Sequence, residues 1–138
     1  MPTQNINVIF TVTWVRPNGI NGPYCFGDRK EVRVDPNWAK RNVIYRWIKA
    51  STGEVTMVGE TDRSLAERAN NYCSATPGSL AGGTNQKLYQ EQTRLLQLRD
   101  YLYLEFTDHV SGYNLTNQRD RCFAEHLLIA LLKPYLQC

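Results

Sequence analysis

The stretch VIYRWIKASTGEVTMVG, residues 43–59, contains the two segments that decide the fold. Val43 to Ala50 is rich in branched and aromatic residues, which favour strands. Ser51 to Glu54 has the composition of a short hairpin loop, and Val55 to Gly59 returns with strand character. We therefore expect a β-hairpin here. Alternation along its first strand places Arg46 on one face and four residues on the other: Val43, Tyr45, Trp47 and Lys49.

The sequence before residue 43 predicts another hairpin. Asn7 to Val15 (NVIFTVTWV) alternates branched and aromatic side chains with threonines. Two clusters of turn-forming residues follow between positions 17 and 23, and Tyr24 to Val34 is expected to return as the partner strand. We expect residues 1–42 to form this amino-terminal extension, and residues 43–138 to form the core of the same single domain. The extension could also serve to cover one edge of the sheet.

After Gly59 the chain changes from strand to helix character. Asp62 or Ser64 can cap a short helix that runs through Tyr72, and Asn85 can cap a longer helix from Gln86 to Arg99. Leucines recur at helical spacing in the longer helix: Leu88, Leu95 and Leu98.

The remaining segments complete an α+β pattern. Tyr101 to Thr107 (YLYLEFT) is expected to be a strand, and a last helix is expected from about Thr116 to Lys133, ended by Pro134. From residue 43 the order is then strand, strand, helix, helix, strand, helix. This order predicts helices packed on a small mixed or antiparallel sheet.

The composition is that of one soluble globular domain. The chain has 138 residues, of which 42% are hydrophobic and 21% charged, and a chain of this size buries roughly two thirds of its unfolded surface. It has no apolar run of roughly 20 residues, and its polar start does not resemble a signal peptide, so we expect a cytoplasmic protein without a membrane segment. The spacing of its cysteines and histidines argues against structural zinc and a disulfide framework.

The net charge of +3 is small, but the positive charge is unevenly distributed. Between Asp35 and Glu54 no acid occurs, and cations alternate with aromatic residues: Lys40, Arg41, Arg46 and Lys49 with Trp38, Tyr45 and Trp47. Cations interleaved with aromatic rings suit a nucleic-acid backbone. A solvated strand face with ordinary aromatic packing explains the same pattern.

Glu125 is the most informative single residue. It lies in CFAEHLLIALL, residues 122–132, a segment so apolar that we expect the helix to be largely buried. A buried carboxylate is costly without a partner. Arg121 can supply one through an i,i+4 ion pair. A divalent cation such as Mg²⁺, which carboxylates, waters and phosphate oxygens commonly hold together, is the alternative.

These segments together resemble the GIY-YIG nuclease domain. Val43-Ile44-Tyr45 stands where that family has its first tripeptide, and Met57-Val58-Gly59 stands where it has the second. Arg68 matches the arginine of the short helix that follows, and Tyr72 matches the family's tyrosine or histidine one turn later.

The last helix extends the resemblance to the carboxyl terminus. Glu125 matches the family's metal-binding glutamate, and Pro134 matches its downstream proline. Gln137 stands where the family usually has asparagine, so an amide replaces an amide. Met57 replaces the second motif tyrosine, and a thioether can neither donate a hydrogen bond nor position a water as a phenol does.

The resemblance implies a Mg²⁺- or Mn²⁺-dependent endonuclease that hydrolyses phosphodiester bonds in double-stranded DNA. Glu125 would hold the ion on the side of the leaving group, Tyr45 would orient the attacking water or take its proton, and Arg68 would clamp the scissile phosphate, with Tyr72 beside it. A phenol is a weak base unless nearby cations lower its pKa of roughly 10. We expect Lys49, on the same strand face as Tyr45, to be that cation.

The resemblance also suggests how DNA is chosen. Small members of this family include restriction endonucleases that read DNA through insertions in the domain, often as homodimers. Candidate contacts to DNA are the amides and cations of two regions: Lys40, Arg41 and Arg46, and Asn85, Gln86, Lys87 and Arg94. The alternative, which Met57 keeps open, is a catalytically silent domain that binds DNA or another protein.

Overall fold

A computed structural model describes residues 2–6, 10–17, 35–73 and 83–137, and its centre is an antiparallel sheet. The strands β1 (Val43–Lys49), β2 (Val55–Thr61) and β3 (Leu102–Thr107) lie in the order β2-β1-β3. The loop between β1 and β2 turns at Gly53, whose φ of 75° favours glycine. The predicted hairpin is therefore confirmed, with Tyr45 opposite Gly59 and Trp47 opposite Met57.

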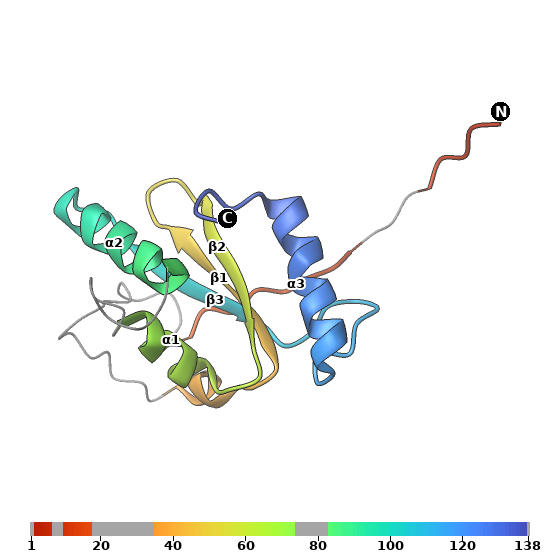
Figure 1. Cartoon of the computed structure of the whole chain (residues 1–138), viewed down its shortest axis with the longest axis horizontal. Coiled ribbons are helices and arrows are strands. Elements are labelled where there is room, and N and C mark those ends of the chain that lie inside the picture. The colour runs from red at the N-terminus through yellow and green to blue at the C-terminus, as the bar shows by residue number, and fades with distance from the viewer. Residues whose placement is uncertain (1, 7–9, 18–34, 74–82, 138) are drawn as a thin grey trace.

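Helices cover both faces of this sheet, as Figure 1 shows. The helices α1 (Leu65–Cys73) and α2 (Gly83–Gln97) lie on one face, and α3 (Gln118–Leu132) lies on the other. A short 3₁₀ helix, η1 (Pro36–Ala39), precedes β1. The α+β fold class and the predicted order of elements from residue 43 onward are confirmed.

Alternation along β1 divides the core into two clusters. Val43, Tyr45 and Trp47 are buried against α1 and α2, whereas Ile44 is buried on the α3 side. The predicted face of β1 is confirmed for these residues. Each face thus has its own hydrophobic layer, and the central strand contributes to both.

Two helix starts follow the capping signals in the sequence. Of the two predicted caps for α1, Ser64 takes the role: its Oγ accepts from the N–H of Glu67 and donates to the Glu67 carboxylate, both at 3.2 Å. Asn117 caps α3 by accepting from the N–H of Asp120. At the other end Lys133 adopts a left-handed conformation just before Pro134.

The predicted limits of α2 were wrong. The helix begins at Gly83, so Asn85 lies inside it, and it ends at Gln97 because Arg99 turns the chain with a φ of 60°. Leu98 therefore lies beyond the helix and is 64% exposed. Gln92 is buried on the inner side instead, where its carbonyl oxygen accepts from the N–H of Leu102 at 2.7 Å.

The predicted amino-terminal hairpin is not present over the described residues. Residues 10–17 contain no strand. They are hydrogen-bonded to the sheet through an isolated β-bridge between Val15 and Phe106 of β3. Val12 and Trp14 pack against the α3-side core instead. The predicted partner strand, residues 24–34, lies outside the described residues.

The expectation that α3 is largely buried was also wrong. Only one side faces the sheet, with Arg121, Ala124 and Leu128 buried, whereas Phe123 and Leu131 are 52% and 58% exposed. Apolar composition therefore does not account for the environment of Glu125, which depends on the strand beside it. In the part of the chain that the structure describes, no helix combines the length and apolar character needed to cross a bilayer.

Candidate functional site

The candidate site lies along β2, where the Tyr45 ring crosses over Gly59. These residues are paired across β1 and β2, and a Cβ built on Gly59 would overlap the hydroxyl and ring carbons of Tyr45. Only glycine leaves room for the ring here. The buried ring can therefore extend its hydroxyl across β2 toward α1.

Helix α1 supplies a guanidinium and a second phenol to that hydroxyl. Arg68 Nε donates to Tyr45 Oη at 2.8 Å, and Arg68 Nη2 donates to Tyr72 Oη at 3.1 Å. The two hydroxyls are 2.8 Å apart. Because Arg68 and Tyr72 are one helical turn apart, both side chains leave α1 on the same side. The structure thus brings together three of the predicted site residues.

Met57 ends this chain of hydrogen bonds. Its Sδ lies 3.7 Å from Tyr72 Oη, which donates to it. Tyr45 then donates to Tyr72, and Arg68 donates to both hydroxyl oxygens, so each hydroxyl in the group has an acceptor for its proton. Met57 is 1% exposed and fills the core beneath the hydroxyls. Met57 thus replaces a phenol on β2 in a site that still contains two others, those of Tyr45 and Tyr72.

Burial strengthens the preference of both phenols for the neutral form. Burial raises the pKa of Tyr45 well above its ordinary value, and the neighbouring Tyr72 raises it further, although Arg68 acts in the opposite direction. Burial likewise raises the pKa of Tyr72. A cation does act to lower the pKa of Tyr45, as expected, but burial outweighs it, so Tyr45 is suited to orienting a water rather than to taking its proton.

The cation beside Tyr45 is Arg68, and the prediction of Lys49 in this position was wrong. Lys49 lies at the end of β1, where its charge acts on the carboxylates of Glu91 and Asp100. Alternation gave the correct face for this strand, but it could not give the position along the strand that α1 approaches.

Glu125 reaches the outer edge of β2 from α3. The N–H groups of Val58 and Glu60, two residues apart, both point outward from this strand. That of Val58 donates to Gln137 Oε1 at 3.0 Å, and that of Glu60 donates to the Glu125 carboxylate. Gln137, which stands where the similar family usually has asparagine, thus lies against β2. The backbone N–H groups of Tyr135 and Leu136 also donate to carbonyls of β2.

The Glu125 carboxylate interacts electrostatically with the group formed by Arg68 and the phenols. It is close enough to Arg68 and to Tyr72 for its charge to act on both. Burial, followed by the charge of Glu60, raises the pKa of Glu125. Its charge would be stabilised by a cation in this position.

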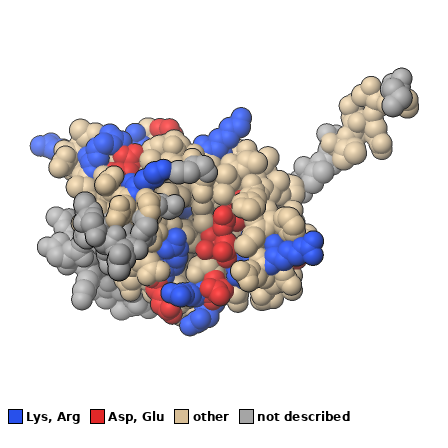
Figure 2. Space-filling view, in the orientation of Figure 1, with Lys and Arg blue, Asp and Glu red and all other residues tan. Residues whose placement is uncertain are grey.

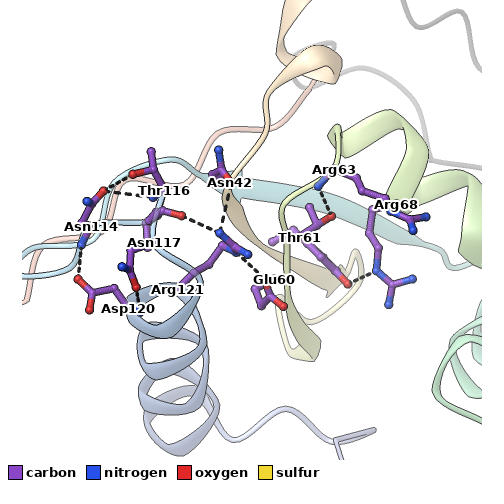
Figure 3. Close-up of polar contacts among 12 residues, drawn as sticks. Asn42, Glu60, Thr61, Arg63, Arg68, Asn114, Thr116, Asn117, Asp120 and Arg121 are labelled. Atoms are coloured by element: carbon purple, nitrogen blue, oxygen red, sulfur yellow. Dashed lines mark hydrogen bonds and ion pairs between the residues drawn. The ribbon is translucent and has the colours of Figure 1, made fainter.

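Arg121 does not form the i,i+4 pair with Glu125 that the sequence allowed. Figure 3 shows it extending from α3 toward Glu60 and Asn42. Its Nε bonds to Glu60 Oε2, while its Nη1 donates to Asn42 Oδ1 at 3.2 Å and to the Leu115 carbonyl at 3.0 Å. The Arg121 side chain is 4% exposed. This group fixes α3 against β2 one turn before Glu125.

Glu60 and Asn42 are site residues that the sequence analysis missed. Glu60 directly follows Gly59, at a position where strand alternation gave no reason to expect a functional acid. Asn42 precedes β1 with a φ of 56°, a conformation that asparagine tolerates better than most residues. That preference is the only signal in the sequence that could have drawn attention to Asn42.

The donor set at this edge fits a hard divalent cation held mostly by water and substrate. The structure brings the carboxylates of Glu60 and Glu125 together, and Glu60 is already paired with Arg121. Among the described residues, no three or more histidine, cysteine, aspartate or glutamate side chains are arranged so that they could hold a metal ion by themselves. One or two carboxylates completed by waters and phosphate oxygens is the coordination that Mg²⁺ prefers.

Figure 2 shows acidic side chains in the middle of this face of the molecule, with basic side chains on both sides. Among the predicted DNA contacts, Lys40 and Arg41 are exposed and only loosely paired, with Asp108 and Glu67, each at 3.5 Å. Arg46 is engaged elsewhere: its Nε and Nη2 both bond to Glu105, and its guanidinium lies 4.2 Å from the Trp14 ring.

The other predicted DNA contacts lie on α2. Arg94 is paired with Glu91 of the same helix. Asn85, Gln86 and Lys87 lie in the first turns of α2, and Lys87 borders an open pocket of about 450 Å³ beside Arg94 and Tyr135. DNA binding by α2 therefore remains a prediction.

Replacing Gly59 by alanine tests whether the crossing of Tyr45 over β2 is required. We expect Gly59→Ala to lower the free energy of unfolding by about 1–3 kcal/mol, because the ring must move to admit the methyl group. Urea unfolding followed by circular dichroism measures this. Gly83→Ala is the control, since nothing lies within 4 Å of a Cβ built there. Equal stability of the two variants would contradict the proposed packing.

Comparisons of the chain with protein-family models, with curated proteins and with solved structures found no match.

Proposed function

We propose that this protein is a divalent-metal-dependent endonuclease that hydrolyses phosphodiester bonds in double-stranded DNA, in the manner of a restriction enzyme. The observation that carries the proposal is the convergence of Tyr45, Tyr72, Arg68 and Glu125 from three different elements onto one edge of β2. The cytoplasm as its location and a homodimer as its working form are parts of the same proposal.

The chemistry of phosphodiester hydrolysis matches these groups. The oxygen of a water forms a new bond to phosphorus, the bond to the 3′ oxygen breaks, and that oxygen leaves as a hydroxyl after gaining a proton. Negative charge builds up on the phosphoryl oxygens during this step and must be stabilised. The N–H groups of Arg68 that are not bonded to Tyr45 and Tyr72 would donate to those oxygens, because a planar guanidinium suits contact with more than one of them.

Tyr45 has the role of a neutral hydrogen-bonding group. With its pKa raised by burial, it orients the attacking water through its hydroxyl oxygen, and the proton of that water is released to solvent. Glu125, with Glu60 behind it, would hold a Mg²⁺ or Mn²⁺ ion. Such an ion supplies positive charge for the phosphoryl oxygens and for the leaving oxygen. Arg121 holds the helix that carries Glu125.

Tyr45→Phe is the variant that tests the proposal with least disturbance, because it removes only one oxygen. In plasmid and phage DNA incubated with Mg²⁺ or Mn²⁺, we expect cleavage by the wild type to stop when EDTA is added. Tyr45→Phe is expected to cleave about 10²-fold more slowly. Tyr103→Phe is the matched control, since Tyr103 lies on β3 and contacts Arg16 rather than this cluster.

The second candidate is a DNA-binding or protein-interaction domain without catalytic activity. The observation that favours it is Met57, which places a thioether where the similar family has a phenol. Binding of DNA with no cleavage under either metal would support this candidate and contradict the hydrolase. Cleavage that is equal in Tyr45→Phe and Tyr103→Phe would contradict the assigned site.

A further inference from the structure

A second polar cleft, of about 370 Å³, lies next to the candidate site. It is formed by the residues between η1 and β1 on one side and by the loop after β3 on the other. The residues that matter for its chemistry are Lys40, Arg41, Asn42, His109, Tyr113 and Thr116. Among the described lining residues Asp108 is the one acid, and it is already paired with Lys40. The cleft is therefore cationic and aromatic in character.

Tyr113 gives this cleft a rigid aromatic wall. It follows Gly112, whose φ of 85° makes the tight turn from Val110 to Tyr113. Val110 enters the α3-side core, and Tyr113 packs partly against that core while also lining the cleft. An aromatic ring supported from behind and open to a polar cleft suits stacking of a nucleobase.

The cations at the cleft are available to an anionic ligand. The pairs Lys40 with Asp108 and Arg41 with Glu67 are both 3.5 Å long, and all four side chains are about half exposed. Exposed pairs of this kind contribute little to stability. Phosphate oxygens could replace these carboxylates as partners without loss of a buried interaction.

The cleft is continuous with the residues that fix the candidate site. Asn42 lines the cleft and also accepts from Arg121, which pairs with Glu60. Arg41 pairs with Glu67, the residue just before Arg68. Arg41 thus belongs to the cleft and also contacts the helix that carries Arg68, so a DNA strand with one phosphate at Arg68 would reach the cleft at Arg41.

We infer that this cleft binds the nucleotide next to the scissile phosphate, with its phosphate on Lys40 and Arg41 and its base, turned out of the duplex, against Tyr113. The inference rests on the proposed function for the position of the cut, but binding itself needs no metal. Its consequence is a preference for DNA in which one base is already unpaired, because turning that base outward costs less.

Fluorescence anisotropy with labelled DNA in EDTA tests this without any cleavage. The probes are a fully paired duplex and the same duplex with one bulged nucleotide. For the wild type we expect about tenfold tighter binding of the bulged duplex. Tyr113→Leu should lose this preference, whereas Tyr113→Phe, which keeps the ring, should retain it. Circular dichroism checks that both variants are folded.

The cations are tested by a pair of double variants with equal loss of charge. We expect Lys40→Gln/Arg41→Gln to weaken binding of both duplexes about tenfold or more, and Arg99→Gln/Lys133→Gln, outside the cleft, to weaken it less than about threefold. These exposed positions leave folding intact. Equal weakening by the two double variants, or equal binding of the bulged and paired duplexes by the wild type, would overturn the inference. Neither result depends on whether the protein cleaves DNA.

Discussion

Glu125→Gln is expected to lower the rate of DNA cleavage about a thousandfold, which corresponds to about 4 kcal/mol of transition-state stabilisation. The glutamine removes the negative charge that would hold a divalent cation. It keeps an oxygen that can accept from the Glu60 N–H at the edge of β2. The substitution therefore separates a catalytic role from the structural role of covering a strand edge. Initial rates on plasmid DNA at saturating Mg²⁺ give the comparison.

Thermal unfolding of the same variant is the control. Because the hydrogen bond to Glu60 is retained, we expect the free energy of unfolding of Glu125→Gln to stay within about 1 kcal/mol of the wild type. Glu125→Leu, which has no acceptor, should be less stable as well as inactive. A Glu125→Gln protein that is folded and cleaves DNA at the wild-type rate would show that the carboxylate only completes the sheet edge.

Arg121→Met is expected to be the most destabilising substitution near the site, by about 3 kcal/mol. Methionine fills similar space but leaves Glu60 without its partner, and it also removes donors from Asn42 and the Leu115 carbonyl. An unpaired, partly buried carboxylate is costly, whereas the net contribution of an intact pair is smaller. Urea unfolding of the purified protein measures the change.

The double variant Arg121→Met/Glu60→Gln shows the source of this loss. If the unpaired charge of Glu60 causes most of it, removing that charge should restore about half of the lost stability. Arg119→Met, an exposed position on the same helix, should change stability by less than about 0.5 kcal/mol. Similar effects of Arg121→Met and Arg119→Met would contradict the role given to the buried pair.

Local sequence signals predicted the elements of the fold well, because each depends on neighbouring residues. Strand alternation placed Val43, Tyr45 and Trp47 on one face, and Ser64 and Pro134 marked helix ends that the structure confirms. The limits of α2 were not predictable in this way. The left-handed turn at Arg99 and the buried Gln92 depend on where β3 begins, which is a tertiary constraint.

The candidate site was only partly predictable for the same reason. Arg68 and Tyr72 lie one turn apart on one helix, so their shared direction follows from the sequence alone. The strand edge that these two side chains approach does not follow from the sequence. For this reason Lys49 was expected beside Tyr45, in the position that Arg68 occupies. Glu60 and Arg121 are 61 positions apart, and no local pattern indicates that they pair.

The location of a bound divalent cation tests the central claim most directly, because it needs no knowledge of the DNA sequence that is recognised. In ¹H–¹⁵N correlation spectra of the labelled protein, Mn²⁺ broadens the signals of nuclei close to it. We expect the amides of Gly59, Glu60 and Glu125 and the Nε–H of Arg68 to broaden first, and this effect to be lost in Glu125→Gln. Broadening centred on other residues, or none at millimolar Mn²⁺, would contradict the assignment of this edge of β2 as a metal-dependent active site.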